Sequence, residues 1–277
     1  MSNVDRLSFV EAELNYLGRT SERPRYYAYE PTDADLAPVM PLEPHLMQIR
    51  DLRPIQHDLS LDTQGFQLKE QTSAVADFWD DDEVRRVYYP EAERFLRELT
   101  GASRVFIFDH LQRRRVTGLK DRTTGGPRQP ATRVHVDHTA KSGPQRVHDL
   151  LPDEAEELLK GRVQVINLWR PLFSPLQDAP LAVCDSRTLA DGDLVPSDLV
   201  YQHRVGETYS VKYNPAHQWY YVPEMRRDEA LLLKIADTRT DIPARFMPHT
   251  SFTDPTTPAG ARPRESIELR TLVFHPN

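Results

Sequence analysis

Cysteine is almost absent from this chain of 277 residues: Cys184 is the only one, so no disulfide can form within the chain. A chain without disulfides is typical of a reducing compartment, and we expect a cytoplasmic protein. The N-terminus has no apolar signal core, and no run of apolar residues approaches the ~18 that a membrane span requires. The sequence therefore predicts no membrane partner.

Glycine is also scarce, with 11 residues against 23 prolines. This balance favours many short strands joined by stiff connections over long helices. Basic residues are outnumbered, since 35 of them against 42 acidic residues give a formal charge of −7, and no lysine-rich block is present. We therefore expect no nucleic-acid partner.

Several common catalytic motifs are missing. The sequence has no P-loop, no Gly-x-Gly-x-x-Gly, no Cys-x-x-Cys and no nucleophile elbow, which excludes several enzyme classes. Cys184 lies in an apolar stretch, where a buried hydrophobic role is expected rather than a nucleophilic one.

The first hundred residues predict an N-terminal arm and helices. A short helix is expected over 7–17 and a strand over 25–29, after which prolines keep the chain extended. Acidic residues at 80–82 start a helix that continues to residue 100, and Pro90 should kink or divide it. We expect residues 1–100 to pack on a barrel formed by residues 101–277, within one domain.

The rest of the chain predicts mainly strands, separated by turn signals. One helix is expected over 149–159, and the loop over 113–130 is expected to be mobile surface. The order of helices followed by many strands favours a β-protein with flanking helices, and a jelly roll fits best. The predicted strands cover residues 104–110, 163–169, 181–184, 208–213, 218–222, 230–235 and 266–274.

Candidate metal ligands occur at His135 and Asp137, in a short strand that ends in a polar turn. Residues two apart on a strand point to the same side, so an imidazole and a carboxylate can face one metal ion. They supply two of the three ligands of the 2-His-1-carboxylate triad of non-haem iron oxygenases.

The third ligand must be a histidine brought close by folding. Six histidines follow Asp137, and positions in the same turn, in a polar connection or beyond the last strand count against most of them. His217 lies between two strands, but the arginines that follow it are in a solvated turn. His249 is preferred, because it follows an apolar strand and precedes a final strand that begins at Arg264-Glu-Ser266. A guanidinium and a hydroxyl on one side of that strand can hold a distal carboxylate of 2-oxoglutarate.

A family resemblance is carried by several segments in a fixed order. They are Val-His-Val-Asp-His at 134–138, Asn-Leu-Trp-Arg-Pro-Leu at 167–172, Ala-Pro-Leu-Ala-Val-Cys-Asp at 179–185, His-Gln-Trp-Tyr-Tyr at 217–221 with Asp-Glu-Ala at 228–230, Pro-His-Thr-Ser-Phe at 248–252 and Pro-Arg-Glu-Ser-Ile-Glu-Leu-Arg at 263–270. From roughly residue 130 onward the chain resembles the hydroxylase/desaturase branch of the Fe(II)/2-oxoglutarate-dependent oxygenases of secondary metabolism. That branch includes gibberellin-desaturase-like enzymes and the hydroxylase partner of cephamycin methoxylation.

The resemblance implies a double-stranded β-helix that uses Fe(II), 2-oxoglutarate and O₂ to oxidise a C–H bond of a small metabolite or amino-acid-like substrate. The expected iron ligands are His135, Asp137 and His249. Arg264 and Ser266 are expected to hold 2-oxoglutarate, with Arg270 as the second candidate because it lies six residues further along the same side of the strand.

Six residues are candidates for the substrate pocket, and they suggest an amphipathic or carboxylate-bearing small molecule. We expect a monomer or homodimer. Two other functions stay open, a cupin-type metalloenzyme that works without 2-oxoglutarate through His217, and a non-catalytic partner subunit of an oxygenase pair. The pocket candidates are Arg170, Tyr213, His217, Trp219, Tyr221 and Phe252.

Overall fold

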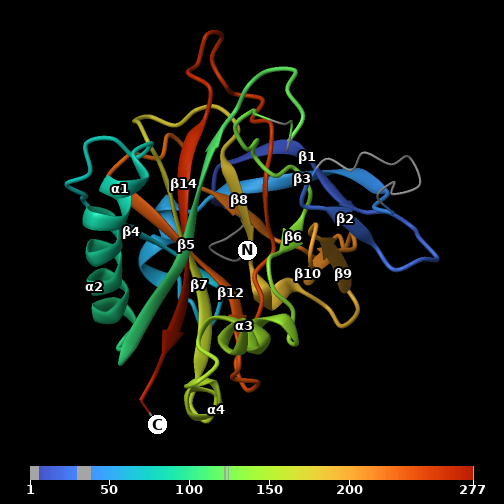
Figure 1. The fold of residues 1–277 in the computed structure, drawn as a ribbon. Helices are drawn as coiled ribbons and strands as arrows, with labels where there is room; N and C mark the ends of the chain where they lie inside the picture. The colour runs from blue at the N-terminus through green and yellow to red at the C-terminus, as the bar shows by residue number, and fades with distance from the viewer. Residues whose placement is uncertain (1–5, 30–38, 122, 124, 277) are drawn as a thin grey trace.

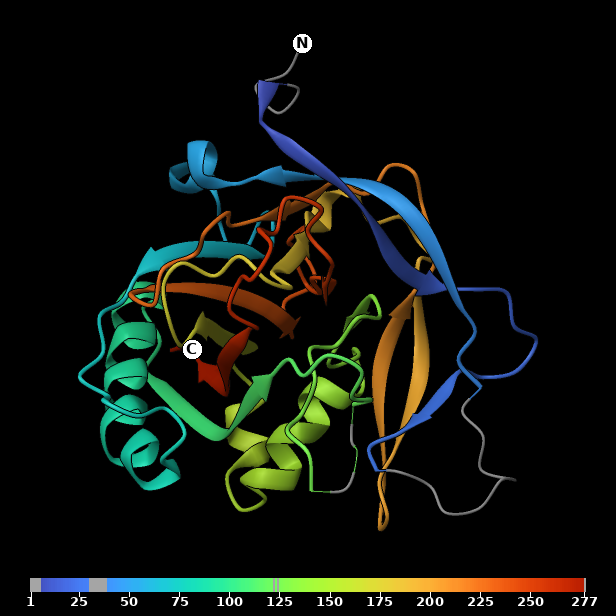
Figure 2. The ribbon, with the colours of Figure 1, turned by 90° about the horizontal axis from the view of Figure 1, so that it is seen from above.

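The computed structural model describes residues 6–29, 39–121, 123 and 125–276. Two sheets face each other and form a jelly roll (Figures 1 and 2). The larger sheet has nine strands in the order β1 (Phe9–Leu17), β3 (Leu42–Asp51), β11 (Trp219–Tyr221), β8 (Leu181–Cys184), β13 (His249–Ser251), β6 (His135–Val136), β10 (Val205–Val211), β9 (Leu194–Val200) and β2 (Arg25–Tyr27).

The smaller sheet is antiparallel throughout. Its central strands are apolar because both of their faces are covered, one by the larger sheet and the other by helices. Its five strands run in the order β4 (Phe66–Glu70), β12 (Glu229–Asp237), β7 (Val163–Pro171), β14 (Glu265–Phe274) and β5 (Arg104–Arg114).

Helices cover the outer face of the smaller sheet and one opening of the barrel. The segment α1 (Asp81–Glu83) begins where the Asp80 side chain accepts hydrogen bonds from two backbone N–H groups. A π-helical turn over Val84–Tyr88 leads into α2 (Tyr89–Thr100), and Pro90 lies in the first turn of α2. The helical conformation is continuous from Asp81 to Thr100, so Pro90 does not divide the helix in two. The segments α3 (Ser142–Leu150) and α4 (Ala155–Leu158) lie below the sheets in Figure 1. Among the described residues, no helix is long and apolar enough to cross a membrane.

Alternation along β7 decides which side chains reach the barrel interior. Trp169 belongs to the apolar core between the two sheets, whereas Ile166 and Leu168 belong to the core under the helices. The same alternation divides β12, where Leu233 is inside and Leu232 outside. Side chains of β7 and of β12 up to Lys234 therefore face the interior at every second position, and a register shift interrupts this alternation before Ala236.

The helix predicted over 7–17 is wrong, because these residues form β1. The side chains of Ala12, Leu14 and Tyr16 are buried and alternate with polar Glu13 and Asn15, a period of two that fits a strand. The first hundred residues also do more than wrap the core. They supply β1, β2 and β3 to the larger sheet and β4 to the smaller one.

The helix predicted over 149–159 is also wrong in its bounds. Helix α3 ends at Leu150, and a turn that contains Pro152 separates it from α4. Proline disfavours a helical conformation in the residue before it, which explains the break. The predicted strands are present, and the prediction missed β3, β9 and β13.

The strand β5 contains one extra residue at Phe108. Arg270 of β14 is opposite Asp109, whereas the next residue of β14, Thr271, is opposite Ile107. This bulge reverses the alternation of β5. Val105 therefore belongs to the core under the helices, while the later odd-numbered residue Arg113 lines the interior.

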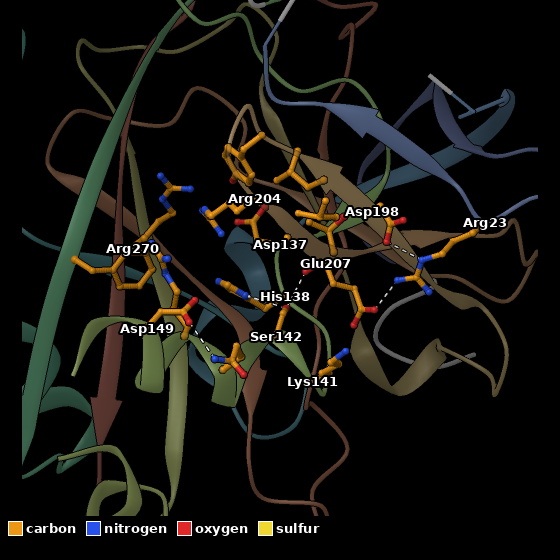
Figure 3. Close-up of a pocket in the computed structure, with 18 residues that line it drawn as sticks. Arg23, Asp137, His138, Lys141, Ser142, Asp149, Asp198, Arg204, Glu207 and Arg270 are labelled. Carbon is orange, nitrogen blue, oxygen red and sulfur yellow. Dashed lines mark hydrogen bonds and ion pairs between the residues drawn. The ribbon is translucent and has the colours of Figure 1, made fainter. Parts of the chain in front are cut away.

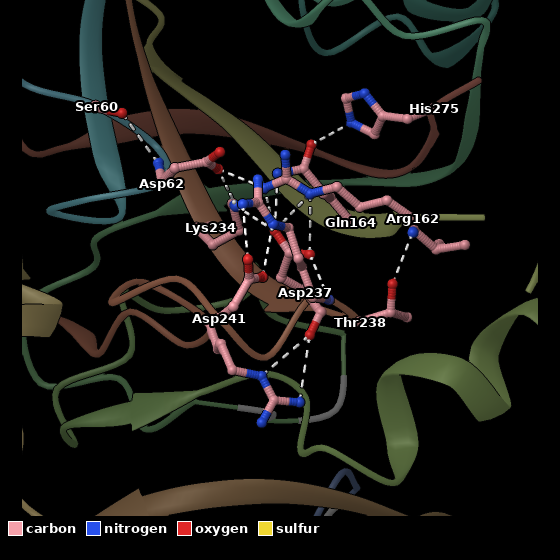
Figure 4. Close-up of polar contacts among 12 residues, drawn as sticks. Ser60, Asp62, Arg162, Gln164, Lys234, Asp237, Thr238, Asp241 and His275 are labelled. Atoms are coloured by element: carbon pink, nitrogen blue, oxygen red, sulfur yellow. Dashed lines mark hydrogen bonds and ion pairs between the residues drawn. The ribbon is translucent and has the colours of Figure 1, made fainter. Parts of the chain in front are cut away.

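A cluster of paired charges lies at the Val163 end of β7 (Figure 4). Lys234 Nζ is 2.5 Å from Asp237 Oδ2 and 2.9 Å from Asp62 Oδ1, and Arg162 Nη2 is 2.7 Å from Asp237 Oδ2. The side chains of Lys234 and Asp237 are fully buried. Because each buried charge has an opposite partner, the cluster reads as structural.

Candidate metal and co-substrate site

The three predicted metal ligands meet inside the barrel. His135 on β6 and His249 on β13 are register partners, and their ring centroids are 4.4 Å apart. Asp137 lies just beyond β6, and its Oδ1 is 3.4 Å from His135 Nε2. One potential ligand atom from each of the three residues lies within 4.8 Å of the other two. Such a group of two imidazoles and one carboxylate can occupy one face of an iron coordination sphere.

Backbone and side-chain contacts orient this group. His135 Nδ1 is 2.8 Å from the carbonyl oxygen of Arg133, and His249 Nδ1 is 3.4 Å from that of Met247. When Nδ1–H donates to a carbonyl, the lone pair of the ring is on Nε2, and this nitrogen is the one left to bind a metal. Asn167 Nδ2 donates to Asp137 Oδ2 at 2.8 Å and holds the carboxylate in place.

Burial also prepares the imidazoles to coordinate a cation. Desolvation, followed by the charge of Arg133, lowers the pKa of His135 to about 3, and desolvation likewise lowers the pKa of His249. Both rings are therefore neutral near pH 7, which is the form that binds a metal. Although burial by itself raises the pKa of Asp137, its contact with His135 and the positive charge nearby hold it well below 3.8.

A buried guanidinium lies in the same inner cavity. Arg264 is 2% exposed, and it lines the cavity together with His135, Asp137 and His249. Its Nε donates to Ser266 Oγ at 3.1 Å, and its Nη1 donates to the Ala179 carbonyl at 2.9 Å. Burial, then the neighbouring Arg113, lowers the pKa of Arg264 to about 9, so it remains charged near pH 7.

Two further charged residues line this cavity, and the sequence prediction missed both. Arg113 is directly opposite Ser266 on the neighbouring strand, and Glu268 is two residues further along β14. Burial, then the charge of Asp137, raises the pKa of Glu268 to about 7. In the part of the chain that the structure describes, Arg113, Arg264 and Glu268 form no ion pair within 4.0 Å. The cavity therefore has guanidinium groups available for an anionic ligand.

Similar proteins identify the family. A family model described as "Oxidoreductase/YMDC permease-like domain" matches residues 14–274. The hydroxylase/desaturase efuI of Hormonema carpetanum is 36% identical over 250 residues, which are 82% of this chain and 82% of efuI. The Fe(II)/2-oxoglutarate-dependent dioxygenase nvfI of Aspergillus novofumigatus is 32% identical over 256 residues, 90% of either chain. A solved structure of the iron and alpha-ketoglutarate-dependent endoperoxidase NvfI has a TM-score of 0.88 and 29% identity, and covers 98% of this chain and 100% of that one.

The chain belongs to the Fe(II)/2-oxoglutarate-dependent oxygenases. The predicted family, the jelly-roll fold and the dependence on Fe(II), 2-oxoglutarate and O₂ are confirmed by these matches. The comparisons leave the roles of individual residues in this oxygenase open.

The second candidate for the carboxylate clamp, Arg270, is already engaged in the oxygenase. Its Nε is 2.6 Å and its Nη2 2.5 Å from the two carboxylate oxygens of Asp109. Although burial by itself lowers the pKa of Arg270, Asp109 raises it above the usual value of an arginine. Arg270 lines the outer recesses and is not among the residues around the inner cavity. Arg264 is therefore better placed than Arg270 to hold the co-substrate.

Four of the predicted pocket residues lie on the outer face of the larger sheet and not in the pocket. Trp219, Tyr221 and Phe252 pack with β1 in a core outside the barrel, and Tyr213 stacks on His45 at 3.7 Å. The physical reason is alternation, because Tyr220, between Trp219 and Tyr221, is the residue of β11 that packs inside.

His217, the remaining alternative for the third ligand, is also placed outside the barrel. Its Nε2 is 3.0 Å from Asp193 Oδ2, and its Nδ1 is 3.1 Å from Tyr16 Oη. Both ring nitrogens are therefore occupied. The structure does not bring His217 to the pair of His135 and Asp137.

Arg170 is a further pocket prediction that the structure overturns. It is fully buried, but it follows Trp169 on β7 and so points to the face covered by the helices. Its guanidinium lies 5.3 Å from the Tyr88 ring and 5.6 Å from the Phe78 ring, and Nη2 donates to the Gln71 carbonyl. Arg170 stabilises the contact between helices and sheet by cation–π interactions.

The oxygenase has two larger recesses in front of the inner cavity. One has a volume of about 670 Å³ and shares Arg113 and His135 with the inner cavity, and the other has a volume of about 380 Å³. Asp137 and Arg270 line both recesses. The loop that the sequence predicts to be mobile surface contributes Lys120 and Arg128 to the larger recess. Small molecules can therefore approach the candidate ligands His135 and Asp137 from outside.

Proposed function

We propose that His135, Asp137 and His249 hold the single Fe(II) ion of this oxygenase, which oxidises a C–H bond of a small molecule. The observation that carries the proposal is the convergence of two neutral imidazoles and one carboxylate within 4.8 Å in a buried cavity. Three protein ligands leave three positions of an octahedral ion for the co-substrate and O₂. Iron bound there would couple decarboxylation of 2-oxoglutarate to oxidation of the substrate.

Arg264 and Ser266 bind the distal carboxylate of 2-oxoglutarate in this proposal. The Arg264 guanidinium lies in the same cavity as the three candidate iron ligands, and the hydrogen bond from its Nε to Ser266 Oγ aligns the two side chains. Arginine suits this task because its planar fork matches a carboxylate and keeps its charge when buried. Arg113, opposite Ser266, adds positive potential at the same end of the cavity.

Apolar residues exclude water around the reacting groups. Trp169 and Leu181 line the inner cavity, and the Trp169 ring lies 4.9 Å from the Arg264 guanidinium. A low-polarity wall strengthens the attraction between a guanidinium and a bound carboxylate. Asn167 keeps the Asp137 carboxylate oriented, so this residue acts through the ligand that it positions.

The alternatives to this proposal have less support. A metalloenzyme that uses His217 lacks its third ligand, because His217 is held by Asp193 and Tyr16. The reaction outcome stays open among hydroxylation, desaturation and oxidative cyclisation, because the relatives differ in activity, one being named a hydroxylase/desaturase and another an endoperoxidase. One domain over residues 1–277, a cytoplasmic location and a monomeric or dimeric state stay predictions from the sequence.

Anaerobic titration of the protein with Fe(II) and 2-oxoglutarate tests the proposal. The chelate of this cofactor class gives a weak visible charge-transfer band, which we expect from the wild-type protein. We expect His249→Ala to abolish the band and His217→Ala to retain it. Absence of the band in the wild-type protein would reject the iron site. Loss of the band in His217→Ala alone would move the third ligand to that residue.

A further inference from the structure

The smaller outer recess lies between α3 and the β9–β10 hairpin and reaches the candidate iron ligand Asp137 (Figure 3). Its volume of about 380 Å³ is in the range of small-molecule sites. Aromatic rings at Phe108 and Tyr201 form part of its wall. The recess therefore has the size, the apolar surface and the position that a substrate site for this oxygenase requires.

Most carboxylates that line the recess already have partners. Arg23 is 2.6 Å from Asp198 and 2.6 Å from Glu207, and Thr139 donates to the other oxygen of Glu207. Gln145 Nε2 donates to Asp149 at 3.0 Å, as the dashed line in Figure 3 shows. Apart from Asp137, these acids are occupied. A cationic ligand would have to displace existing contacts.

Two guanidinium groups of the recess have no such partner. Within the described ranges, Arg146 and Arg204 form no ion pair within 4.0 Å, whereas Arg270 is paired with Asp109. Arg204 projects toward Asp137 and Arg270 in Figure 3. The chain as a whole is acidic, with a net charge of −7, so a concentration of unpaired arginines at this place is not explained by an excess of basic residues.

Aromatic rings hold the guanidinium groups of these two arginines in place. The Arg146 guanidinium lies 4.8 Å from the centre of the Phe108 ring, and that of Arg204 lies 4.1 Å from the centre of the Tyr201 ring. Cation–π contacts hold the two groups against the wall of the recess. Burial, then repulsion by Arg204, lowers the pKa of Arg146. A bound anion would relieve this repulsion.

We propose that the smaller recess binds a substrate with a carboxylate group on an apolar, ring-containing body. The carboxylate lies between Arg146 and Arg204, and the ring packs on Phe108 and Tyr201. The C–H bond to be oxidised then points toward Asp137. This assignment rests on the proposed iron site and adds a substrate class to it.

A matched pair of fluorescent probes tests the assignment on metal-free protein. The anionic probe is 1-anilinonaphthalene-8-sulfonate, and the neutral one is N-phenyl-1-naphthylamine, which has the same ring system. We expect replacement of both arginines, Arg146→Gln with Arg204→Gln, to weaken binding of the anionic probe by about tenfold or more, because a charge-assisted contact is lost at each position. Binding of the neutral probe should change less than about twofold.

Three controls keep the result interpretable. Arg94→Gln removes the same charge from an exposed site on α2 and should leave anionic-probe binding unchanged. Lysine at positions 146 and 204 keeps the charge and should retain most of the binding. In competition, 1-naphthoate should displace the anionic probe, and its methyl ester should not. Circular dichroism establishes that each variant is folded.

The outcomes separate this inference from the proposed function. Equal effects of the glutamine variants on both probes, or displacement by the ester as well as by the acid, would overturn the carboxylate site. A wild-type protein that shows arginine-dependent probe binding but no charge-transfer band with Fe(II) and 2-oxoglutarate would reject the iron site alone.

Discussion

The protein has two groups of buried charges at opposite ends of the smaller sheet, and they differ in how the charges are paired. At the Val163 end of β7, Lys234 and Asp237 are fully buried and form an ion pair at 2.5 Å (Figure 4). At the Pro171 end, Arg264 is buried to a similar extent but has no ion pair among the described residues. Burial alone therefore does not distinguish a structural charge from a functional one. These two groups of charges differ in whether the buried charge has an oppositely charged partner.

This difference has an energetic reason. A buried charge without a partner lowers the stability of the fold, so it persists where a ligand later supplies the opposite charge or where other groups of the protein take the place of a partner. Arg170 shows a third arrangement, because aromatic rings and a backbone carbonyl surround its guanidinium instead of a carboxylate. The four predictions below test whether the two ends of the sheet respond to substitution in opposite ways.

The largest effect on stability is expected for Asp237→Ala. This substitution leaves Lys234 and Arg162 without their shared buried carboxylate, and the free energy of unfolding should fall by about 3–5 kcal/mol. Urea unfolding followed by circular dichroism measures the change. Asp241→Ala, which breaks an exposed ion pair with Arg239 close by, should have little effect. Equal losses for the two variants would contradict the structural role of the buried cluster.

The opposite response is expected for Arg264→Met. Removal of this unpaired charge should change the free energy of unfolding by less than about 1 kcal/mol, because the lost hydrogen bonds are offset by relief of a buried charge. The dissociation constant for 2-oxoglutarate, measured through the charge-transfer band, should rise about 10- to 100-fold. If the Arg264→Met variant were strongly destabilised and still bound 2-oxoglutarate normally, the buried charges at both ends of the sheet would be structural.

A smaller effect on co-substrate binding is expected for Arg113→Gln. Arg113 donates to the Gln129 carbonyl and contributes to the cavity mainly through its positive potential. We expect 2-oxoglutarate to bind about fivefold more weakly than to the wild-type protein. Arg113→Lys, which preserves the charge, should recover most of the affinity. An effect as large as that of Arg264→Met would make Arg113 the principal clamp.

The smallest effect concerns the acid dependence of the paired cluster. Burial by itself raises the pKa of Asp62, but Arg162 and Lys234 more than offset it and lower the pKa from 3.8 to about 2. Because the folded state binds this proton more weakly than the unfolded state, the stabilisation is complete above pH 3.8 and is lost as the pH falls toward about 2. Melting temperatures from about pH 4 to about pH 2 should fall more steeply for the wild-type protein than for Asp62→Asn. Parallel curves would contradict the depressed pKa.

The sequence predicts the parts of the site that lie close together in the chain. His135 and Asp137 are two residues apart at the end of β6, and Arg264 and Ser266 are two residues apart at the start of β14, so alternation predicts that each pair lies on one side. The jelly roll follows from many short apolar strands and turn signals. His249 is predicted from the order of strand, histidine and Arg-x-Ser strand, and the structure brings it next to His135.

The sequence does not predict which face of a strand is turned inward. Trp219, Tyr220 and Tyr221 are all aromatic and all buried, so composition does not show that only Tyr220 packs inside. Arg170 is buried on the helix-covered face for the same reason, one position from an interior tryptophan. The sequence does not predict that Arg113 lines the inner cavity, because strict alternation from Val105 would place its side chain under the helices. Only the bulge at Phe108 turns it inward.

That single extra residue gives the two halves of β5 different surroundings. Before Phe108, the odd-numbered side chains face the helical layer, and beyond it the odd-numbered side chains face the reaction chamber. If β5 kept all its residues and its pairing at Val105 but had no bulge, Gln112 would replace Arg113 at the chamber wall without any change in composition. Within this fold, the register between two strands can therefore set the charge of the chamber as effectively as a substitution.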